Sequence, residues 1–299
     1  MEKTMFNLLA NHALFGTKHL ILIGVCVALI VLLFIFSRKL SFATVCKTMF
    51  YVGIVSETIK IFYYIVQNEG RYGGLLPKTD LPFHLCSIQI LFVCILNFSK
   101  NEKIKRFLLS FMYPSGLIGG IAAILIATDS SRNGLWIITA QYFLYHVALV
   151  VLALNIGTRK ELNLKTTDYF NCLKFVGVLL FVAVYVNSMI FETVPTYELN
   201  EAGEYVFTGT KIITGNFMYV VSPPQDGLPF LTEKYGWGVY MAHYASLVLL
   251  CITLCYIKPI LAGIKAEIAQ KHQKQLKPAE NPATNASETE SEVATTKAE

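Results

Sequence analysis

The stretch "LPFHLCSIQ" (residues 81–89) holds the residue types most capable of chemistry, because His84 and Cys86 stand two positions apart and Ser87 follows. Such a group can be a nucleophile with its base, part of a metal site, or ordinary polar positions in an apolar helix. In a regular helix two residues at this spacing point about 200° apart. We therefore expect His84 and Cys86 to face different centres and to take any partner from other helices.

The composition of the chain is typical of a membrane protein. Of its 299 residues, 54% are hydrophobic and 15% are charged, whereas soluble domains carry about 25% charged residues. Runs of about 20 apolar residues are typical of transmembrane helices. The sequence predicts an all-α membrane protein with a bundle of seven transmembrane helices, at residues 20–36, 43–66, 82–98, 107–127, 135–157, 171–191 and 236–257. Pro82 suits the first turn of the third helix.

The basic residues predict the orientation of this bundle. Lysines and arginines are concentrated in alternate loops, at residues 38–39, 100–106, 159–165 and 258–277. Under the positive-inside rule this places the N-terminus outside and the C-terminus in the cytoplasm of a multi-pass protein of the cell membrane. The net charge of +5 is then a topology signal and a possible attraction to acidic lipid, and we expect no nucleic-acid partner. The oligomeric state stays open.

Three further segments differ from the apolar runs. The membrane domain covers residues 1–257 and includes a long outer segment, 192–235, expected to form a cap in which "EYVFTG" and "KIIT" are strand-like pieces around a turn. Residues 258–276 form a basic cytoplasmic extension. Residues 277–299 have the composition of a disordered tail.

Polar and ionisable groups recur at one depth of the predicted bundle. Such groups are costly in a bilayer and usually face the bundle interior or a wet cavity. Glu57 lies one turn from Lys60, so it forms either an ion pair within its helix or a bond to a histidine of another helix. The expected depth indicates a polar cavity open to the outside, lined by Glu57, His84, Gln89, Gln141, His146, Asn187, Tyr240 and His243.

The same histidines offer ligand types suited to zinc. They lack the dense local spacing of a zinc site, and we expect no metal and no cofactor. The "SGLIGG" stretch (residues 115–120) permits close helix approach, for a moving interface or for static packing.

Several stretches together resemble a known family. "LPFHLCS", "QYFLYHVALVV", "GNFMYVVSPP" and "YGWGVYMAHY" resemble the YwaF-like bacterial integral membrane family, which is related to the eukaryotic transmembrane protein 164 family, over about residues 15–260. The resemblance implies a phospholipid acyltransferase that uses a membrane cysteine and a histidine, with His146 and His84 at the histidine positions. In the eukaryotic form the cysteine directly precedes the histidine. Here Phe83 stands at that position, so Cys86 would have to take its place.

These observations support three hypotheses. In the first, the protein acts on acyl groups of membrane lipid: Cys86 or Ser87 is the nucleophile and His146 the base. Glu57 or Gln141 orients the base, and His84 or Asn216 donates a hydrogen bond to the oxyanion. In the second, the cavity binds or transports a small solute. In the third, the polar groups only hold the helices together in a non-catalytic structural membrane protein.

Overall fold

The computed structural model describes residues 13–68, 76, 81–127, 131–132, 135–199, 205–223, 231–232 and 234–276. The chain divides into two units, Met1–Ile257 and Lys258–Glu299, which are described separately. The predicted disordered tail, 277–299, lies outside the described residues.

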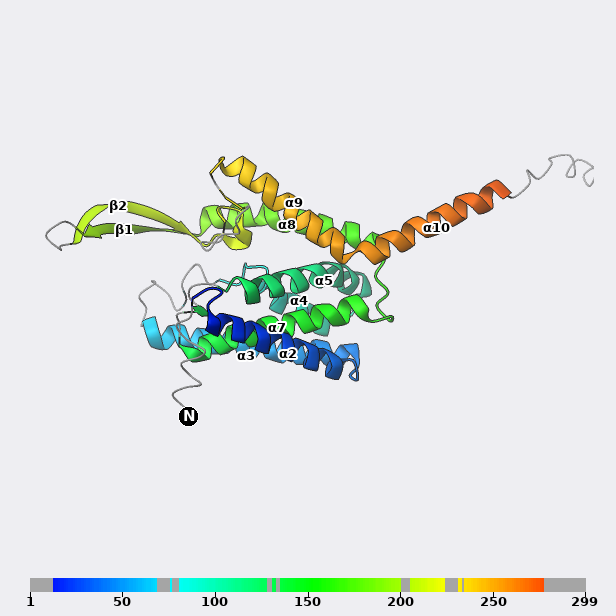
Figure 1. Ribbon diagram of the computed structural model, residues 1–299, viewed down its shortest axis with the longest axis horizontal. Coiled ribbons are helices and arrows are strands. Elements are labelled where there is room, and N and C mark those ends of the chain that lie inside the picture. The colour runs from blue at the N-terminus through cyan, green and yellow to red at the C-terminus, as the bar shows by residue number, and fades with distance from the viewer. Residues whose placement is uncertain are drawn as a thin grey trace, which may run out of the picture. The chain divides into compact units, whose positions relative to one another are not determined.

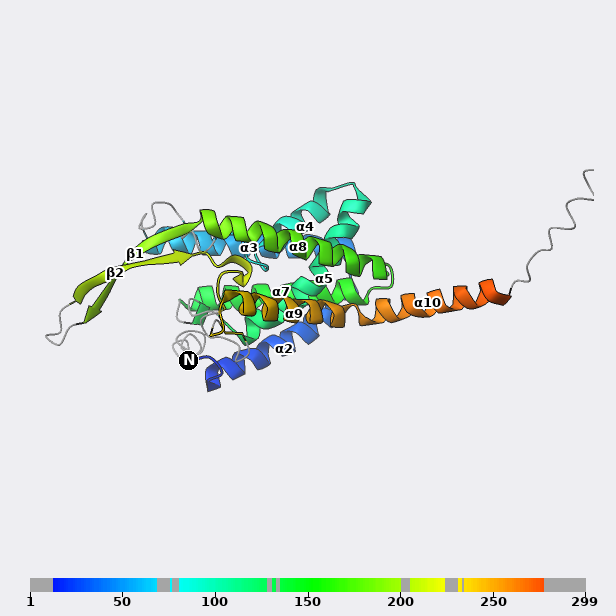
Figure 2. The same cartoon turned by 90° about the horizontal axis from the view of Figure 1, so that it is seen from above.

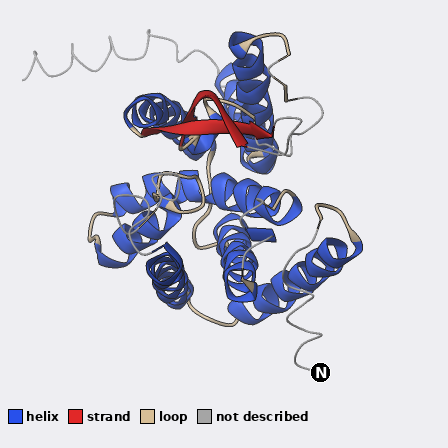
Figure 3. Ribbon diagram, turned by 90° about the vertical axis from the view of Figure 1, so that its left-hand side faces the viewer, coloured by secondary structure: helices blue, strands red, loops and turns tan. Residues whose placement is uncertain are grey.

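The first unit is built from long apolar helices, as the composition predicts. They are α2 (Thr17–Ser37), α3 (Phe42–Asn68), α5 (Glu102–Leu125), α7 (Trp136–Thr158), α8 (Thr166–Met189) and α9 (Trp237–Cys255). By length and composition these six are the helices of the described chain able to cross a membrane. They run side by side (Figures 1 and 2), and Figure 3 views them roughly end-on.

The expected third span is the exception, so the prediction of seven spanning helices is not confirmed. Its helix, α4 (Ile88–Phe98), has only 11 residues and is about 16 Å long, half of a hydrocarbon core of about 30 Å. Residues 81–87 form turns instead, in which Phe83 N–H donates to the Leu81 carbonyl at 2.7 Å. Pro82 therefore lies in a turn and does not begin the helix.

Helices α5 and α7 form the centre of the bundle. In each, 56% of the membrane window is buried, against 11–17% in the other four long helices. They approach closely because glycines face α7: a Cβ on Gly120 would lie 2.6 Å from Val150 Cγ2 and 3.2 Å from the His146 carbonyl oxygen. Small residues of this kind let helix backbones pack in lipid, where burial from water no longer drives association. The "SGLIGG" stretch therefore serves close packing here.

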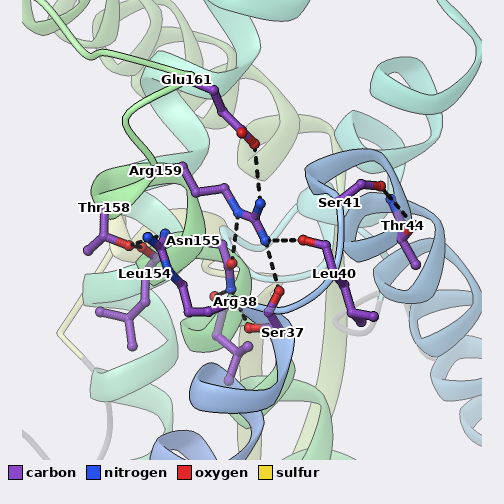
Figure 4. A network of polar contacts seen from close by, with 11 residues as sticks. Ser37, Arg38, Leu40, Ser41, Thr44, Leu154, Asn155, Thr158, Arg159 and Glu161 are labelled. Atoms are coloured by element: carbon purple, nitrogen blue, oxygen red, sulfur yellow. Dashed lines mark hydrogen bonds and ion pairs between the residues drawn. The ribbon is translucent and has the colours of Figure 1, made fainter.

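Arg159 fastens one end of the bundle, here named the arginine end (Arg38, Arg106 and Arg159). Its side chain is only 8% exposed, and its Nε donates to Asn155 Oδ1 at 3.0 Å. One terminal nitrogen donates to the Ser37 and Leu40 carbonyls, both at 2.8 Å. Figure 4 shows how this joins the end of α2 to the end of α7. The sequence had marked Arg159 only as a topology signal.

Arg106 joins α5 to the start of α8 in a similar way. Its Nε donates to Asp168 Oδ1 at 2.8 Å, and its terminal nitrogens donate to the Asn163 and Leu162 carbonyls. The Asp168 carboxylate is 2% exposed, and it also accepts the Lys165 N–H at 2.7 Å. The loop before α8 is thereby fixed to the first turns of α5.

Replacing Arg159 with methionine is expected to destabilise the protein. The change keeps much of the side-chain volume but leaves the Ser37, Leu40 and Asn155 oxygens without this donor, a loss of about 3 kcal/mol or more. We expect the thermal midpoint in detergent, followed by loss of the monodisperse peak after heating, to fall by about 6–12 °C. Lys160→Met is the matched control, because Lys160 is exposed and should leave the midpoint unchanged. Equal midpoints for the two variants would contradict this role.

A hairpin follows α8 directly. Strand β1 (Phe191–Leu199) pairs antiparallel with β2 (Tyr205–Thr214), from Phe191 opposite Thr214 to Leu199 opposite Tyr205. The hairpin was predicted, but its pairing was wrong: "YVFTG" and "KIIT" belong to one strand, continued through Gly209 (φ 148°) beside a bulge at Thr196/Tyr197. The connection at 200–204 lies outside the described residues.

In the described residues, the hairpin is not the part of the outer segment that packs against the helix bundle. Its apolar side chains Tyr197, Phe207 and Ile212 are 55%, 56% and 64% exposed. The segment after β2 makes them: Phe217, Met218 and Val220 are buried against the bundle. We name the end of the bundle where α2, α7 and α9 begin the hairpin end.

Candidate functional site

A cavity of about 690 Å³ opens between α3, α5, α7, α8 and α9. Most of its wall is apolar, with Ile118, Leu179 and Val248 among the lining side chains. Its lining groups with polar or ionisable side chains are Glu57, Lys60, Tyr63, Tyr64, His84, Cys86, Ser87, Ser115, Ser131, Gln141, Tyr142, Tyr145, His146, Tyr219, Tyr244 and Cys251. The size falls in the range of small-molecule pockets, about 300–1,000 Å³.

His146 on α7 carries the clearest chemical signal in the cavity. Its side chain is 3% exposed, and its Nδ1 lies 2.7 Å from the Tyr142 carbonyl oxygen one turn earlier. A carbonyl only accepts, so Nδ1 carries the proton and Nε2 presents a lone pair. Among the described residues, Nε2 is the one buried side-chain polar atom that has no hydrogen-bond partner. An unsatisfied buried group of this kind costs about 1–3 kcal/mol, which favours a ligand or a reacting proton as its missing partner.

His19 shows what a purely structural histidine looks like in the same bundle. It is fully buried; its Nδ1 accepts the Phe15 N–H at 2.9 Å, and its Nε2 lies 3.1 Å from the Ile124 carbonyl. Both ring nitrogens are satisfied, and the ring joins α2 to α5. His19 stands at the edge of the first apolar run, where the sequence pattern does not reveal its contacts.

Residues 81–87 bring His84, Cys86 and Ser87 into the wall of one cavity. The expected helix over these residues was wrong, because the chain forms turns there, and that His84 and Cys86 face different centres stays a prediction. Tyr145 holds this segment against α7, since its hydroxyl donates to the Cys86 carbonyl at 2.8 Å. The residue next to His146 thus fixes the backbone of both candidate nucleophiles.

Glu57 forms the local ion pair rather than a described bond to a histidine. Its carboxylate lies 2.8 Å from Lys60 Nζ, with both side chains about a fifth exposed on the cavity wall. The orienting partner of His146 is the Tyr142 carbonyl, neither Glu57 nor Gln141. Gln141 also lines the cavity, and its amide donates to Ser56 Oγ of α3.

The other predicted binding residues lie outside the cavity lining and have structural contacts. Gln89 is buried, and its amide donates to Ser115 Oγ at 2.8 Å. Asn216 folds its own turn, because its Oδ1 accepts the Val221 and Ser222 N–H groups. His243 is exposed on α9. Two of the three histidines predicted as site residues therefore line the cavity, and among the described residues no group of three or more His, Cys, Asp or Glu is placed to hold a metal.

A left-handed turn closes the hairpin end of the cavity. Asn216, Met218 and Tyr219 have φ values of 43°, 57° and 53°, a region that side chains rarely adopt and that costs about 1–3 kcal/mol at each residue. Met218 and Tyr219 line the cavity. The His84 ring packs on Phe217 and Tyr219, with centroids 5.0 and 6.3 Å apart.

Four side chains hold this turn through successive carbonyls. Asn187 donates to Phe217 O at 3.1 Å, Tyr244 to Met218 O at 2.7 Å, Tyr240 to Tyr219 O, and Trp237 to Val220 O at 2.9 Å. These donors come from α8 and from the first two turns of α9. Their combined hold explains why a strained turn persists, and it fixes the rings against which His84 packs. Asn187 and Tyr240, predicted as binding residues, stabilise the turn that lines the cavity and do not line the cavity themselves.

Replacing Asn187 with leucine is expected to release the turn. Asn187 Oδ1 also accepts the Phe217 N–H at 2.8 Å, so leucine orphans two buried backbone groups at a cost of about 2–6 kcal/mol. We expect a lower thermal midpoint and faster proteolysis within residues 215–223. Ser188→Leu is the control, because Ser188 is exposed on the same helix. A protease pattern like that of the unchanged chain would refute the role of Asn187.

The tyrosines were the functional candidates that sequence reasoning did not identify. Tyr142 stands four residues before His146, the spacing that places its carbonyl beside the His146 ring. The spacing was visible in "QYFLYH", but the roles of Tyr145, Tyr219 and Tyr244 depend on contacts between distant segments.

A comparison against known proteins identifies a family for this chain. The model of the TMEM164 family matches residues 14–256, which include every element of the cavity. No curated protein and no solved structure matches the chain.

Proposed function

Because the chain belongs to the TMEM164 family and is a multi-pass membrane protein, we propose that it is an enzyme that transfers or hydrolyses acyl groups of membrane lipid in the cell membrane. The observation that carries this proposal is the buried Nε2 of His146, which has no described partner in a cavity that also presents Cys86 and Ser87. A fixed tautomer with a free lone pair is what a general base requires.

The chemistry follows from these groups. His146 Nε2 takes the proton of the Cys86 thiol or the Ser87 hydroxyl as that atom attacks the ester carbonyl carbon. The tetrahedral adduct collapses, the ester C–O bond breaks, and the leaving alcohol takes the proton back from the His146 imidazolium. A second hydroxyl, from water or from a lipid lacking that acyl chain, then attacks the acyl-enzyme while His146 accepts its proton. The bond between the acyl carbon and Cys86 sulfur or Ser87 oxygen breaks, and that atom takes the proton back from His146.

The shape of the cavity supports a lipid substrate. Its wall is mostly apolar, as an acyl chain requires, and His84, Cys86 and His146 are among its polar groups. Helices α8 and α9, which form one side, have only 11% of their membrane windows buried. Most of the surface of these two helices is therefore free to contact lipid, and the predicted orientation would place the hairpin end outside.

The proposal is tested on the purified chain in vesicles that contain phospholipid with a labelled acyl chain. We expect time-dependent appearance of labelled free fatty acid, or of labelled product when an acceptor lipid lacking one chain is added. Absence of both products in the folded protein would contradict the proposal. Stabilisation by a small solute, lost in His146→Ala, would then favour solute binding.

A further inference from the structure

Helix α10 (Ile257–Leu276), which lies in the second unit apart from its first residue, has an exposed apolar face. Ile257, Leu261, Ile264 and Ile268 are 42%, 50%, 49% and 61% exposed. At 100° per residue these positions, with Ile260, fall within an arc of about 100°. Such an arc is the width expected of a face that rests on an apolar phase.

Basic residues accompany this face. The described helix carries Lys258, Lys265, Lys271 and Lys274 against a single acidic residue, Glu267, so its formal charge is four minus one, or +3. Lys271 falls within the angle of the arc beyond Ile268 and pairs with Glu267 at 2.9 Å, whereas Lys258 and Lys265 flank one side of the arc. Their long stems can lie along an apolar surface while the ammonium groups stay in water.

The pattern fits a lipid surface better than a second copy of the chain. The spacing 257, 261, 264, 268 is that of a coiled-coil seam, but the next seam positions are Lys271 and Gln275. A coiled coil needs about three to four heptads, and this seam covers fewer than two. The helix also contains Gly263, a residue of low helix propensity that adds no side chain to a seam. The helix follows within two residues of Cys255, the last residue of the candidate span α9.

We propose that α10 binds along the surface of an acidic membrane. Its isoleucines and leucine enter the boundary between headgroups and acyl chains, and its lysines pair with lipid phosphates. This binding is separate from acyl transfer and does not depend on it.

The test places a tryptophan on each side of the helix in the full chain. Ile264→Trp lies in the apolar arc, and Ala266→Trp lies opposite; both positions are exposed. Each variant is reconstituted in vesicles that contain phosphatidylglycerol and lipid brominated high on its acyl chains. The emission of the unsubstituted chain, which has two tryptophans, is subtracted. We expect bromine to quench the added tryptophan at 264 and to leave that at 266 bright.

Charge is tested in the same Ile264→Trp chain. Changing both Lys258 and Lys265 to glutamine should reduce the quenching, because each lysine lost lowers the equilibrium constant for helix binding about fivefold at low salt. Vesicles of phosphatidylcholine alone should also reduce the quenching. Equal quenching at 264 and 266, or none at either, would overturn the proposal. Blue-shifted emission at 264 without quenching would indicate a protein surface, and unchanged quenching on neutral vesicles would refute the requirement for acidic lipid.

Discussion

Changing His146 to glutamine should lower acyl transfer by about 10²–10⁴-fold, the usual contribution of a positioned general base. Glutamine keeps a polar side chain of similar reach but has no group that accepts a proton at neutral pH. We expect the loss in kcat, because the base acts as the nucleophile is deprotonated and not when lipid binds. The measurement is initial rate against lipid concentration in mixed micelles.

His243→Gln is the matched control for that experiment. His243 is a histidine of another long helix, and it is exposed and outside the cavity lining. We expect its rate to equal that of the unchanged chain. Similar losses of rate in both variants would show that the histidines matter for folding or insertion. An unchanged rate in His146→Gln would show that His146 is not the base.

The second large effect concerns the nucleophile. Either Cys86→Ala or Ser87→Ala should abolish turnover, by roughly 10⁴-fold or more, while the other variant keeps most of it. Both residues line the cavity, and the Tyr145 bond to the Cys86 carbonyl fixes the backbone of both. The measurement is turnover of the two variants side by side.

Chemical probes give an independent answer to the same question. Protection of Cys86 from iodoacetamide by a lipid ester would identify the thiol, and a fluorophosphonate adduct on Ser87 would identify the hydroxyl. Retention of full turnover in both alanine variants would contradict a covalent route. Tyr145→Phe serves as a milder probe, because it loosens the segment without removing either group.

The sequence predicted the long helices well because apolar length alone specifies them. It failed at residues 81–87, where an apolar composition and Pro82 suggested a helix start. There the chain forms turns that contact distant segments: Tyr145 donates to the Cys86 carbonyl, and Phe83 packs on Phe217 with ring centroids 5.4 Å apart. Such contacts are invisible in local pattern, so the structure has turns at residues 82–87 where the sequence predicted the start of a spanning helix.

The polar residues show a second limit of sequence reasoning. The expected depth in the bundle indicated that Gln89, Asn187 and His146 lie within the membrane domain. It did not indicate which of these side chains has its hydrogen-bonding groups paired. Gln89 and Asn187 bind Ser115 and the Phe217 backbone, whereas His146 keeps an unpaired nitrogen among the described residues. Glu57 paired with Lys60 one turn away, because a neighbour on the same helix face needs no tertiary arrangement.

The central claim is that His146 Nε2 activates a nucleophile in a lipid-filled cavity. The most direct measurement is intact-protein mass spectrometry after the chain meets a phospholipid without an acyl acceptor and is quenched in acid. We predict a mass increase of one acyl group, mapped to Cys86 or Ser87, in the unchanged chain and in His243→Gln, and none in His146→Gln. An adduct of equal yield in His146→Gln, or one mapped elsewhere in the chain, would contradict the claim.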